Sequence, residues 1–353
     1  MENNTTPELF NMFSLSETRP ELCDHLISRE QYLSFLDGQM EEHKVLCVDG
    51  VEGVGVTTTL ALFARRHSEN CASYFNNGWS RHLLNPQTIV RSLLRQLSYY
   101  TQTELDPKEE ENTLANCIFR ITRQTRNKNK YIFFVLDGFS NLPAVYVDGI
   151  KGALAPLFSI TNSRFLFSGD KEEIARLLPE GIMAKQTNEI LKFQLNDIEG
   201  YLKEIDPDLQ QSDIETIYEL SGKGLARRLA ILTEKLQLEG LDKIREYDRQ
   251  MKEDFFEEDF DWIENQKDQR LSLLMALLTF SEIPLTKVSV VRTLKMEDGE
   301  IDDLIEKCQS YIKEEGDSIF LRSNDFRKYL HGKLAHLKTD IELLLIDVIA
   351  IVR

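Results

Sequence analysis

Short, continuous apolar runs alternate with amphipathic segments through the first half of the chain. The runs are Val45–Val48, Ala72–Phe75, Tyr131–Asp137, Arg164–Gly169 and Phe193–Leu195. Runs of this length predict strands that are buried on both faces, as in the interior of a parallel sheet. Segments with the helical period lie between them, for example over residues 86–97. The alternation predicts an α/β fold built on a parallel sheet.

The second half of the chain carries mainly helical patterns. Helices are expected at 196–202, 213–220, 225–238, 269–280, 285–294 and 300–308. Two short runs, Tyr311–Lys313 and Ser318–Leu321, flank a polar turn and predict a β-hairpin. Helices followed by a hairpin suggest a winged helix, preceded by a helical lid domain.

The chain is acidic. Its 353 residues carry a formal net charge of −17, and the sequence pI is near 4.9. Sequence-independent binding to nucleic acids or anionic membranes needs a basic face, so we expect protein partners rather than DNA, RNA or a membrane. The basic run Arg120–Lys130 is a candidate for nucleic-acid contact, although a solvated helix end is favoured. The acidic residues between Glu297 and Glu306 argue against DNA binding by the winged helix.

Cysteine usage and the chain ends predict a cytoplasmic protein. The five cysteines are far apart and form no C-x-x-C pair, which is typical of free thiols in a reducing compartment. Residues 1–24 have no basic-then-apolar signal sequence. The longest apolar stretch, Ile341–Val352, contains Glu342 and Asp347 and is too short to span a bilayer. Neither the histidines nor the cysteines show metal-binding spacing.

A glycine-rich turn connects the first apolar run to the helix after it. Gly50, Gly53 and Gly55 precede a threonine triplet, and Gly50-x-x-x-x-Gly55-x-Thr57 has the spacing of a phosphate-binding P-loop. Glycines allow successive backbone N–H groups to point at a phosphate, and the helix N-terminus adds partial positive charge. The hydroxyl of Thr57 or Thr58 is a candidate magnesium ligand.

The lysine of the P-loop pattern is absent. Val56 takes its position, and no other lysine lies between Lys44 and Lys108. This loss removes a charge-assisted contact to the β- and γ-phosphates but leaves the backbone cradle. The alternative to a phosphate site is a plain strand-to-helix turn, in which Val56 packs under the loop.

Two charged residues on later runs complete the candidate nucleotide site. Asp137 ends a continuous apolar run, the position at which the second P-loop motif holds magnesium. Thr57 and Asp137 are therefore the candidate magnesium ligands. Arg164, at the start of the next run, is a candidate phosphate contact. Structural roles stay open for both, because a strand-end aspartate often caps a turn and an arginine can solvate the start of a strand.

The order of these features resembles the signal-transduction ATPases with numerous domains, the STAND group of AAA+-related NTPases that includes NACHT and NB-ARC proteins. Residues 50–57 match Walker A without its lysine, and Tyr131–Asp137 matches the Walker B strand. Ile27–Glu30 lies where the family has hydrophobic-Gly-Arg-Glu, with serine for glycine, and Ser221–Leu225 resembles the Gly-x-Pro segment without proline. Gly138–Asn141 lacks the second acid that usually polarises the attacking water.

The resemblance covers about residues 25 to 335 and implies a domain plan. It comprises a P-loop NTPase-like domain at 25–195, a helical lid at 196–260 and a winged helix at 261–335. Residues 1–24 form a leader or linker, and residues 336–353 begin a further helix or form a tail.

The resemblance also implies a signalling scaffold that switches between closed and oligomeric states, in immunity or antiphage defence, with ATP or ADP and magnesium as candidate ligands. It implies self-association or a separate effector or sensor chain. The departures from the family pattern, at Val56 and within Gly138–Asn141, fall on catalytic positions. We therefore expect weak or absent ATP hydrolysis. The alternatives are an active ATPase with another cation in place of the lysine, and an AAA+-type DNA-associated regulator.

Overall fold

The chain forms two compact units, an N-terminal unit of residues 1–234 and a C-terminal unit of residues 235–353, in a computed structural model. The structure describes residues 26–76, 84–101, 116, 118–120, 122–123, 131–140, 142–250, 256–281, 285–297, 299–308, 311–315, 318–321 and 324–352. The expected leader, residues 1–24, and most of the basic run 120–130 lie outside the described residues.

The N-terminal unit is built on a five-stranded parallel sheet, which confirms the predicted fold class. The strands are β1 (Val45–Val48), β2 (Cys71–Phe75), β3 (Ile132–Asp137), β4 (Ser163–Ser168) and β5 (Ala184–Gln186), in the spatial order β2-β3-β4-β1-β5. Every pairing is parallel, so the carboxyl ends of all strands lie at one edge of the sheet. β4 separates β1, which leads into the glycine-rich loop, from β3, which ends at Asp137.

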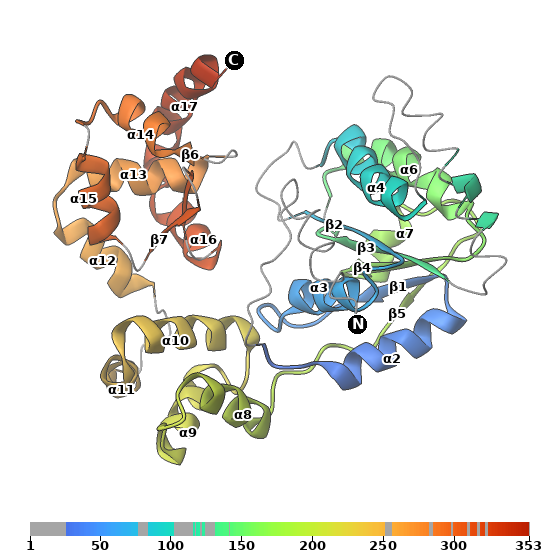
Figure 1. The fold of residues 1–353 in the computed structure, drawn as a ribbon, viewed down its shortest axis with the longest axis horizontal. Coiled ribbons are helices and arrows are strands. Elements are labelled where there is room, and N and C mark those ends of the chain that lie inside the picture. The colour runs from blue at the N-terminus through green and yellow to red at the C-terminus, as the bar shows by residue number, and fades with distance from the viewer. Residues whose placement is uncertain are drawn as a thin grey trace, which may run out of the picture. The chain divides into compact units, whose positions relative to one another are not determined.

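The two faces of this sheet are covered by helices (Figure 1). α2 (Glu30–Glu42) and α3 (Val56–Arg66) lie on one face, and α4 (Pro86–Thr101), α6 (Ala144–Phe158) and α7 (Lys171–Ala175) lie on the other. Successive strand side chains alternate between the faces. In β1, Leu46 packs on the α3 side and Cys47 on the opposite side, and both are fully buried. Burial on both faces explains why the strands read as continuous apolar runs.

The last strand of the sheet is not where the sequence pattern placed it. β5 consists of Ala184, Lys185 and Gln186, an edge strand that pairs only with β1 and is partly exposed, so it needs no apolar run. The predicted strand Phe193–Leu195 is wrong. Gln194 is instead the N-cap of the next helix, where it forms a capping box with Asp197.

Three helices follow the sheet, as expected for a lid. They are α8 (Leu195–Ile205), α9 (Gln211–Leu220) and α10 (Ala226–Glu239). Gly224, just before α10, has φ +91° and accepts a hydrogen bond from the Phe193 N–H at 2.9 Å. The division between the two units falls inside α10, at residue 234. The domain boundaries at 195 and 260 that the resemblance implies stay a prediction.

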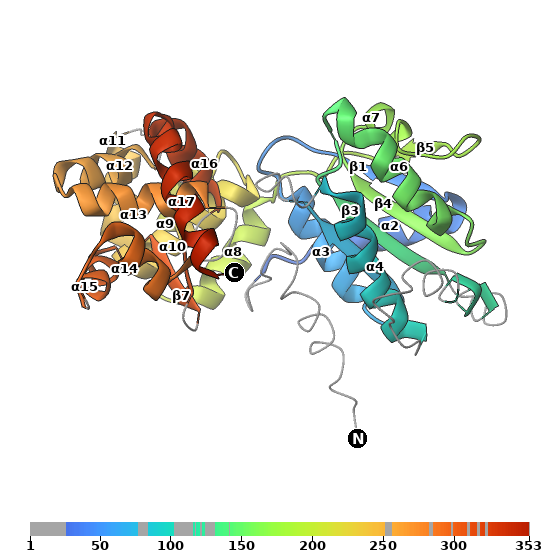
Figure 2. The ribbon, with the colours of Figure 1, turned by 90° about the horizontal axis from the view of Figure 1, so that it is seen from above.

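The C-terminal unit combines helices with a small antiparallel sheet (Figure 2). Its helices are α11 (Leu241–Gln250), α12 (Glu257–Asn265), α13 (Gln269–Phe280), α14 (Lys287–Leu294), α15 (Glu300–Lys307), α16 (Asn324–Lys333), the 3₁₀ turn η3 (Ala335–Leu337) and α17 (Lys338–Val352). The strands β6 (Leu285–Thr286), β7 (Ile312–Glu315) and β8 (Ser318–Leu321) pair in the order β6-β8-β7. The expected hairpin is therefore present as β7 and β8.

α13 is apolar around most of its circumference because other helices of the same unit enclose it. α16 and α17 pack against α13, and Leu274, Met275 and Ala276 have no exposed surface. The apolar pattern of this segment would by itself predict an exposed docking face, but later segments of the chain cover that surface. Among the described residues, none of the helices has both the length and the apolar character of a bilayer span.

Candidate functional site

The loop between β1 and α3 has the backbone form that its glycines predict. Gly53 and Gly55 have φ values of +82° and +95°, in the left-handed region that favours glycine. A Cβ on Gly55 would lie 3.2 Å from the Cβ of Ala226, and one on Gly53 would lie 3.1 Å from the Cβ of Arg227. The loop therefore needs glycine at both positions, for its conformation and for the close approach of α10.

Several backbone donors of this loop are open. The first intrahelical bond of α3 runs from Thr59 N–H to Gly55 O, so the N–H groups of Val56, Thr57 and Thr58 have no intrahelical acceptor. Among the described residues, these three N–H groups also find no other acceptor. They lie at the positive end of the α3 dipole. This is the arrangement that binds phosphate at a helix N-terminus.

Asp137 lies beside the open loop, where the sequence placed it. It ends β3, is only 6% exposed, and its carboxylate accepts hydrogen bonds from the hydroxyls of Thr57 and Ser168 and from the Gly138 N–H. The structure thus joins the two candidate magnesium ligands, Thr57 and Asp137. Both offer hard oxygen donors, which suit magnesium. Within the described residues, no group of three or more His, Cys, Asp or Glu side chains forms a separate metal site.

Ser168 is a site residue that the sequence analysis missed. It ends β4 between the loop strand and the Asp137 strand, and its Oγ also accepts the Gly138 N–H at 2.9 Å. The signal was a polar residue at the carboxyl end of a predicted strand, which is where α/β sheets bind ligands.

Burial raises the pKa of the Asp137 carboxyl, and the hydrogen bonds from Ser168, Thr57 and Gly138 partly oppose the rise. The folded protein therefore holds this proton to a higher pH than the unfolded chain does. The contribution of Asp137 to stability is most favourable at acid pH and is lost as pH rises from the ordinary carboxyl value through the folded pKa. A cation bound beside Asp137 would lower its pKa again, because a positive charge favours the carboxylate form.

We expect Asp137→Asn to raise the melting temperature of the free protein at neutral pH, by roughly 2–4 °C for each kcal/mol gained in a domain of this size. The amide keeps a hydrogen-bonding group in place and removes the buried charge. The gain should disappear below the ordinary carboxyl pKa, where aspartate is protonated in both states. Thermal scans from pH 3 to 8 without magnesium measure this, with exposed Asp148→Asn as the control. A loss of stability at neutral pH would contradict it.

Arg164 is not part of this site, contrary to the sequence-based assignment. It lies near the amino end of β4, whereas the glycine-rich loop and Asp137 lie at the carboxyl ends of the strands. Its Nε donates to the carbonyl of Met40 at 2.5 Å, at the C-terminal end of α2, and its guanidinium lies 4.0 Å from the centre of the Tyr131 ring. Arg164 therefore has a structural role, but it ties a helix end to the sheet rather than solvating the start of a strand.

The first residue of α10 and its neighbour approach the loop from the lid. The Arg227 N–H donates to the carbonyl of Gly53 at 2.8 Å, and the Arg227 guanidinium forms an ion pair with Glu52 at 3.0 Å. These contacts explain why a Cβ on Gly53 would meet the Arg227 side chain. A movement of α10 would therefore change the loop, and the loop would constrain α10.

The segment before α2 is the third element at the loop. Arg29 donates from Nη2 to the carbonyl of Val54 at 2.6 Å and from Nη1 to the carbonyl of Leu191 at 2.9 Å. Its guanidinium also lies 4.1 Å from the centre of the Phe193 ring. Arg29 belongs to the sequence motif Ile27–Glu30 but was not among the predicted site residues.

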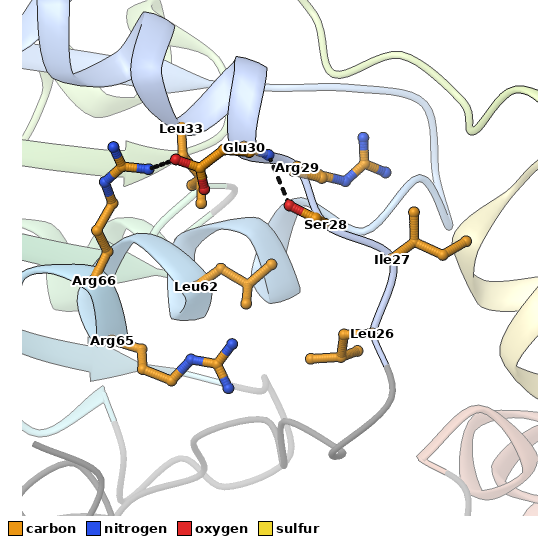
Figure 3. Close-up of a pocket in the computed structure, with 9 residues that line it drawn as sticks. All are labelled: Leu26, Ile27, Ser28, Arg29, Glu30, Leu33, Leu62, Arg65 and Arg66. Atoms are coloured by element: carbon orange, nitrogen blue, oxygen red, sulfur yellow. Dashed lines mark hydrogen bonds and ion pairs between the residues drawn. The ribbon is translucent and has the colours of Figure 1, made fainter. Parts of the chain in front are cut away.

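A pocket of about 360 Å³ opens between this segment and α3 (Figure 3). Its lining consists of Leu26, Ile27, Ser28, Arg29, Glu30, Leu33, Leu62, Arg65 and Arg66. Glu30 forms an ion pair with Arg66 at 2.5 Å, and the Ser28 hydroxyl accepts the Glu30 N–H at 3.2 Å. Arg29 lines this pocket and also donates to the carbonyl of Val54 in the glycine-rich loop.

The loop residues Gly50, Val56 and Thr58 complete the account of the predicted site. A Cβ on Gly50 would lie 2.7 Å from the Val54 side chain. Val56 is partly buried and packs against the core beneath the loop, as the structural alternative proposed for it. Thr58 is partly exposed in the first turn of α3.

Comparisons with known proteins agree with this fold. Residues 21–145 match the family model described as Nephrocystin 3, N-terminal. No curated protein matches the chain. Among solved structures, the chain is similar to a STAND protein with a tetratricopeptide repeat sensor from Pyrococcus horikoshii, with a TM-score of 0.52 and 13% identity over 94% of this chain and 46% of that one.

Two further structures are similar at lower scores. The Walker-type ATPase of Pyrococcus abyssi has a TM-score of 0.48 and 15% identity, over 90% of this chain and 99% of that one. Cdc6p from Pyrobaculum aerophilum has a TM-score of 0.40 and 14% identity, over 96% and 98%. The chain spans less than half the length of the Pyrococcus horikoshii protein. The chain therefore has the fold of a P-loop ATPase, and its sequence departs from the Walker patterns at Val56 and after Asp137.

Proposed function

We propose that the N-terminal unit binds a nucleoside diphosphate or triphosphate at the carboxyl edge of its sheet. The observation that carries this proposal is the set of open N–H groups at Val56, Thr57 and Thr58, beside the hydrogen-bonded pair of Thr57 and Asp137. Phosphate oxygens would accept hydrogen bonds from these N–H groups. The α3 dipole would favour the negative charge of the phosphate. The pocket that Arg29 lines is a candidate place for the rest of the nucleotide.

Magnesium fits the same edge of the sheet. Thr57 and Asp137 would hold it, and the ion would neutralise phosphate charge that the missing lysine no longer meets. Magnesium usually keeps several waters and takes few protein ligands, which is compatible with Thr57 and Asp137 as its protein ligands.

Hydrolysis by this site is expected to be weak. The three residues after Asp137 are Gly138, Phe139 and Ser140, and none of them carries a carboxylate. The Ser140 hydroxyl donates to the carbonyl of Ser168, so it serves the sheet edge. Loss of one transition-state contact typically lowers a rate by a hundredfold or more, and the lysine and the second acid are both absent. The nucleotide then serves mainly to hold one conformation.

The wider role that we propose is a signalling scaffold in the cytoplasm. Bound nucleotide would stabilise a closed state, and its loss or exchange would allow self-association or binding of an effector or sensor chain, in immunity or antiphage defence. The support is the STAND-type fold, together with α10, whose first residues contact the loop through Gly53 and Glu52. The helices and the β6-β8-β7 sheet of the C-terminal unit provide the parts of the proposed winged helix.

The test is the nucleotide content of the purified protein, measured by denaturation and chromatography, followed by calorimetric titration of the nucleotide-free protein with ADP and ATP. We expect bound nucleotide, and Thr57→Ala should weaken magnesium-dependent binding about tenfold, the effect of about 1.4 kcal/mol. Exposed Thr339→Ala, in the C-terminal unit, is the matched control.

Three results would decide against this function. Protein that neither retains nor binds any nucleotide would leave only the structural turn. An unchanged nucleotide affinity of Thr57→Ala would show that the glycine-rich loop does not bind the nucleotide. A turnover of about 1 per second or faster that Asp137→Ala abolishes would favour the active ATPase.

A further inference from the structure

Arg29 is a partly buried cation whose hydrogen-bond partners are neutral. Its guanidinium donates to two backbone carbonyls, those of Val54 and Leu191, and stacks on the Phe193 ring. In the described part of the chain, it forms no ion pair. Asp197 influences it through space, but the Asp197 carboxylate accepts the Gln194 N–H in the α8 capping box. The positive charge of Arg29 is therefore not neutralised by contact with a carboxylate.

Partial burial without a counter-charge is unfavourable for a cation. Desolvation lowers the pKa of the Arg29 guanidinium to about 10, which still leaves it charged at neutral pH. A nearby anion favours the charged form of a partly desolvated cation. An anionic ligand beside Arg29 would therefore offset the cost of its desolvation.

The position of this charge relative to the loop is specific. Nη2 lies 3.8 Å from where a Cβ on Gly55 would be, and Gly55 is the N-cap of α3. The next residue, Val56, has the position at which the P-loop pattern has lysine. A guanidinium has five N–H donors, and two of them have the carbonyls as acceptors, which leaves three for a ligand.

Three other described cations near the loop or on the sheet have partners of their own. Arg227 pairs with Glu52 at 3.0 Å, so the charges of these two side chains cancel at the loop. Lys44 donates to the carbonyl of Phe158 at 2.8 Å, and Arg164 stacks on Tyr131, both at the amino edge of the sheet. Among the described residues that donate to the loop backbone, Arg29 is a cation whose printed contacts include no carboxylate.

We infer that Arg29 contacts the phosphates of the bound nucleotide and supplies the positive charge that the missing P-loop lysine would have supplied. This assignment rests on the proposed function. The carbonyls of Val54 and Leu191 fix the guanidinium plane, and its remaining N–H groups donate to phosphate oxygens beside the open N–H groups of α3. Arginine binds two phosphate oxygens in a planar fork, whereas lysine offers a point charge.

The test measures the affinities of ADP and adenosine for Arg29→Gln and for the parent protein. In each case the unlabelled ligand displaces a bound fluorescent ADP analogue. Glutamine keeps an amide donor for the carbonyls and removes the charge. We expect ADP affinity to fall on the order of ten- to hundredfold, as for loss of a charge-assisted hydrogen bond, with little change for adenosine. Adding Val56→Lys should restore most of the loss, because it returns a cation to the loop.

The control is Arg164→Gln. Arg164 also donates to backbone carbonyls and stacks 4.0 Å from an aromatic ring, but at the opposite edge of the sheet. It should lower the melting temperature about as much as Arg29→Gln does and leave ADP affinity unchanged.

The outcomes separate this assignment from the proposed function. A parent protein that binds no nucleotide overturns both. A parent that binds ADP while Arg29→Gln binds it equally well overturns the assignment alone. An equal loss for ADP and adenosine, or a loss that Val56→Lys does not restore, shows that Arg29 only shapes the loop, and it also overturns the assignment.

Discussion

Gly138→Ala is expected to destabilise the N-terminal unit by about 3 kcal/mol and to abolish nucleotide binding. Gly138 has φ +77°, and a Cβ there would lie 1.9 Å from the backbone oxygen of Asn76. The new methyl group would force the chain after β2 away from the end of β3, where Asn76 Nδ2 now donates to the Gly138 carbonyl. Backbone strain and overpacking each contribute on the order of 1–3 kcal/mol. Because the Gly138 N–H binds the Asp137 carboxylate, the same displacement would move Asp137.

A control in the same unit separates the effect of backbone strain from that of overpacking. Gly181 has φ +82°, and a Cβ there would have no atom within 4 Å. Gly181→Ala therefore measures the cost of the left-handed conformation alone, which is about 1 kcal/mol. Chemical denaturation of both variants and calorimetric titration with ADP give the two readouts. Equal destabilisation by the two substitutions would show that the Asn76 contact relaxes freely, against this prediction.

The sheet and the glycine-rich loop could be predicted from the sequence because both depend on local patterns. Strands buried on two faces are continuous apolar runs, and the spacing of Gly50, Gly55 and Thr57 is contained in eight residues. Asp137 was predictable for the same reason, as the polar end of such a run. The strand β5 was not, because an edge strand of Ala, Lys and Gln carries no apolar signal.

The errors and omissions in the predicted site concern contacts between distant parts of the chain. Arg29 binds carbonyls 25 and 162 residues away, and neither carbonyl has a side-chain signature. Arg164 was placed at the site because its run resembled a family motif, yet residues at opposite ends of one strand lie at opposite edges of the sheet. The cover over α13 comes from α16 and α17, which lie far along the chain.

These contacts suggest how a loop without lysine remains compatible with an anion. The backbone supplies dipoles through α3, and Arg29 supplies a full charge from a segment outside the motif. Glu52 would oppose a phosphate, but its ion pair with Arg227 offsets its charge. The site thus depends on three separate segments, those that carry Arg29, the loop and the start of α10. If the N-terminal unit binds nucleotide as proposed, the loss of lysine from one motif does not by itself abolish binding.

The buried ion pair of the C-terminal unit gives the second large prediction. Lys235 Nζ lies 3.0 Å from Asp259 Oδ1, and both side chains are less than 10% exposed. The Tyr311 hydroxyl also donates to Asp259 Oδ1 at 3.2 Å. The pair joins α10 to α12, and its charges are shielded from water. Removing one partner leaves the other charge buried without this ion pair.

Lys235→Met is therefore expected to destabilise the C-terminal unit by about 3–5 kcal/mol, and the double variant Lys235→Met, Asp259→Leu to recover most of that loss. The double variant replaces two desolvated charges with apolar groups that suit their surroundings. Lys203→Met is the matched control, because its 2.6 Å pair with Glu199 is exposed and is expected to contribute less than about 1 kcal/mol. Chemical denaturation followed by circular dichroism measures all three variants. A double variant as unstable as Lys235→Met would show that shape and hydrogen bonding at Asp259, rather than an unpaired charge, set the stability of this unit.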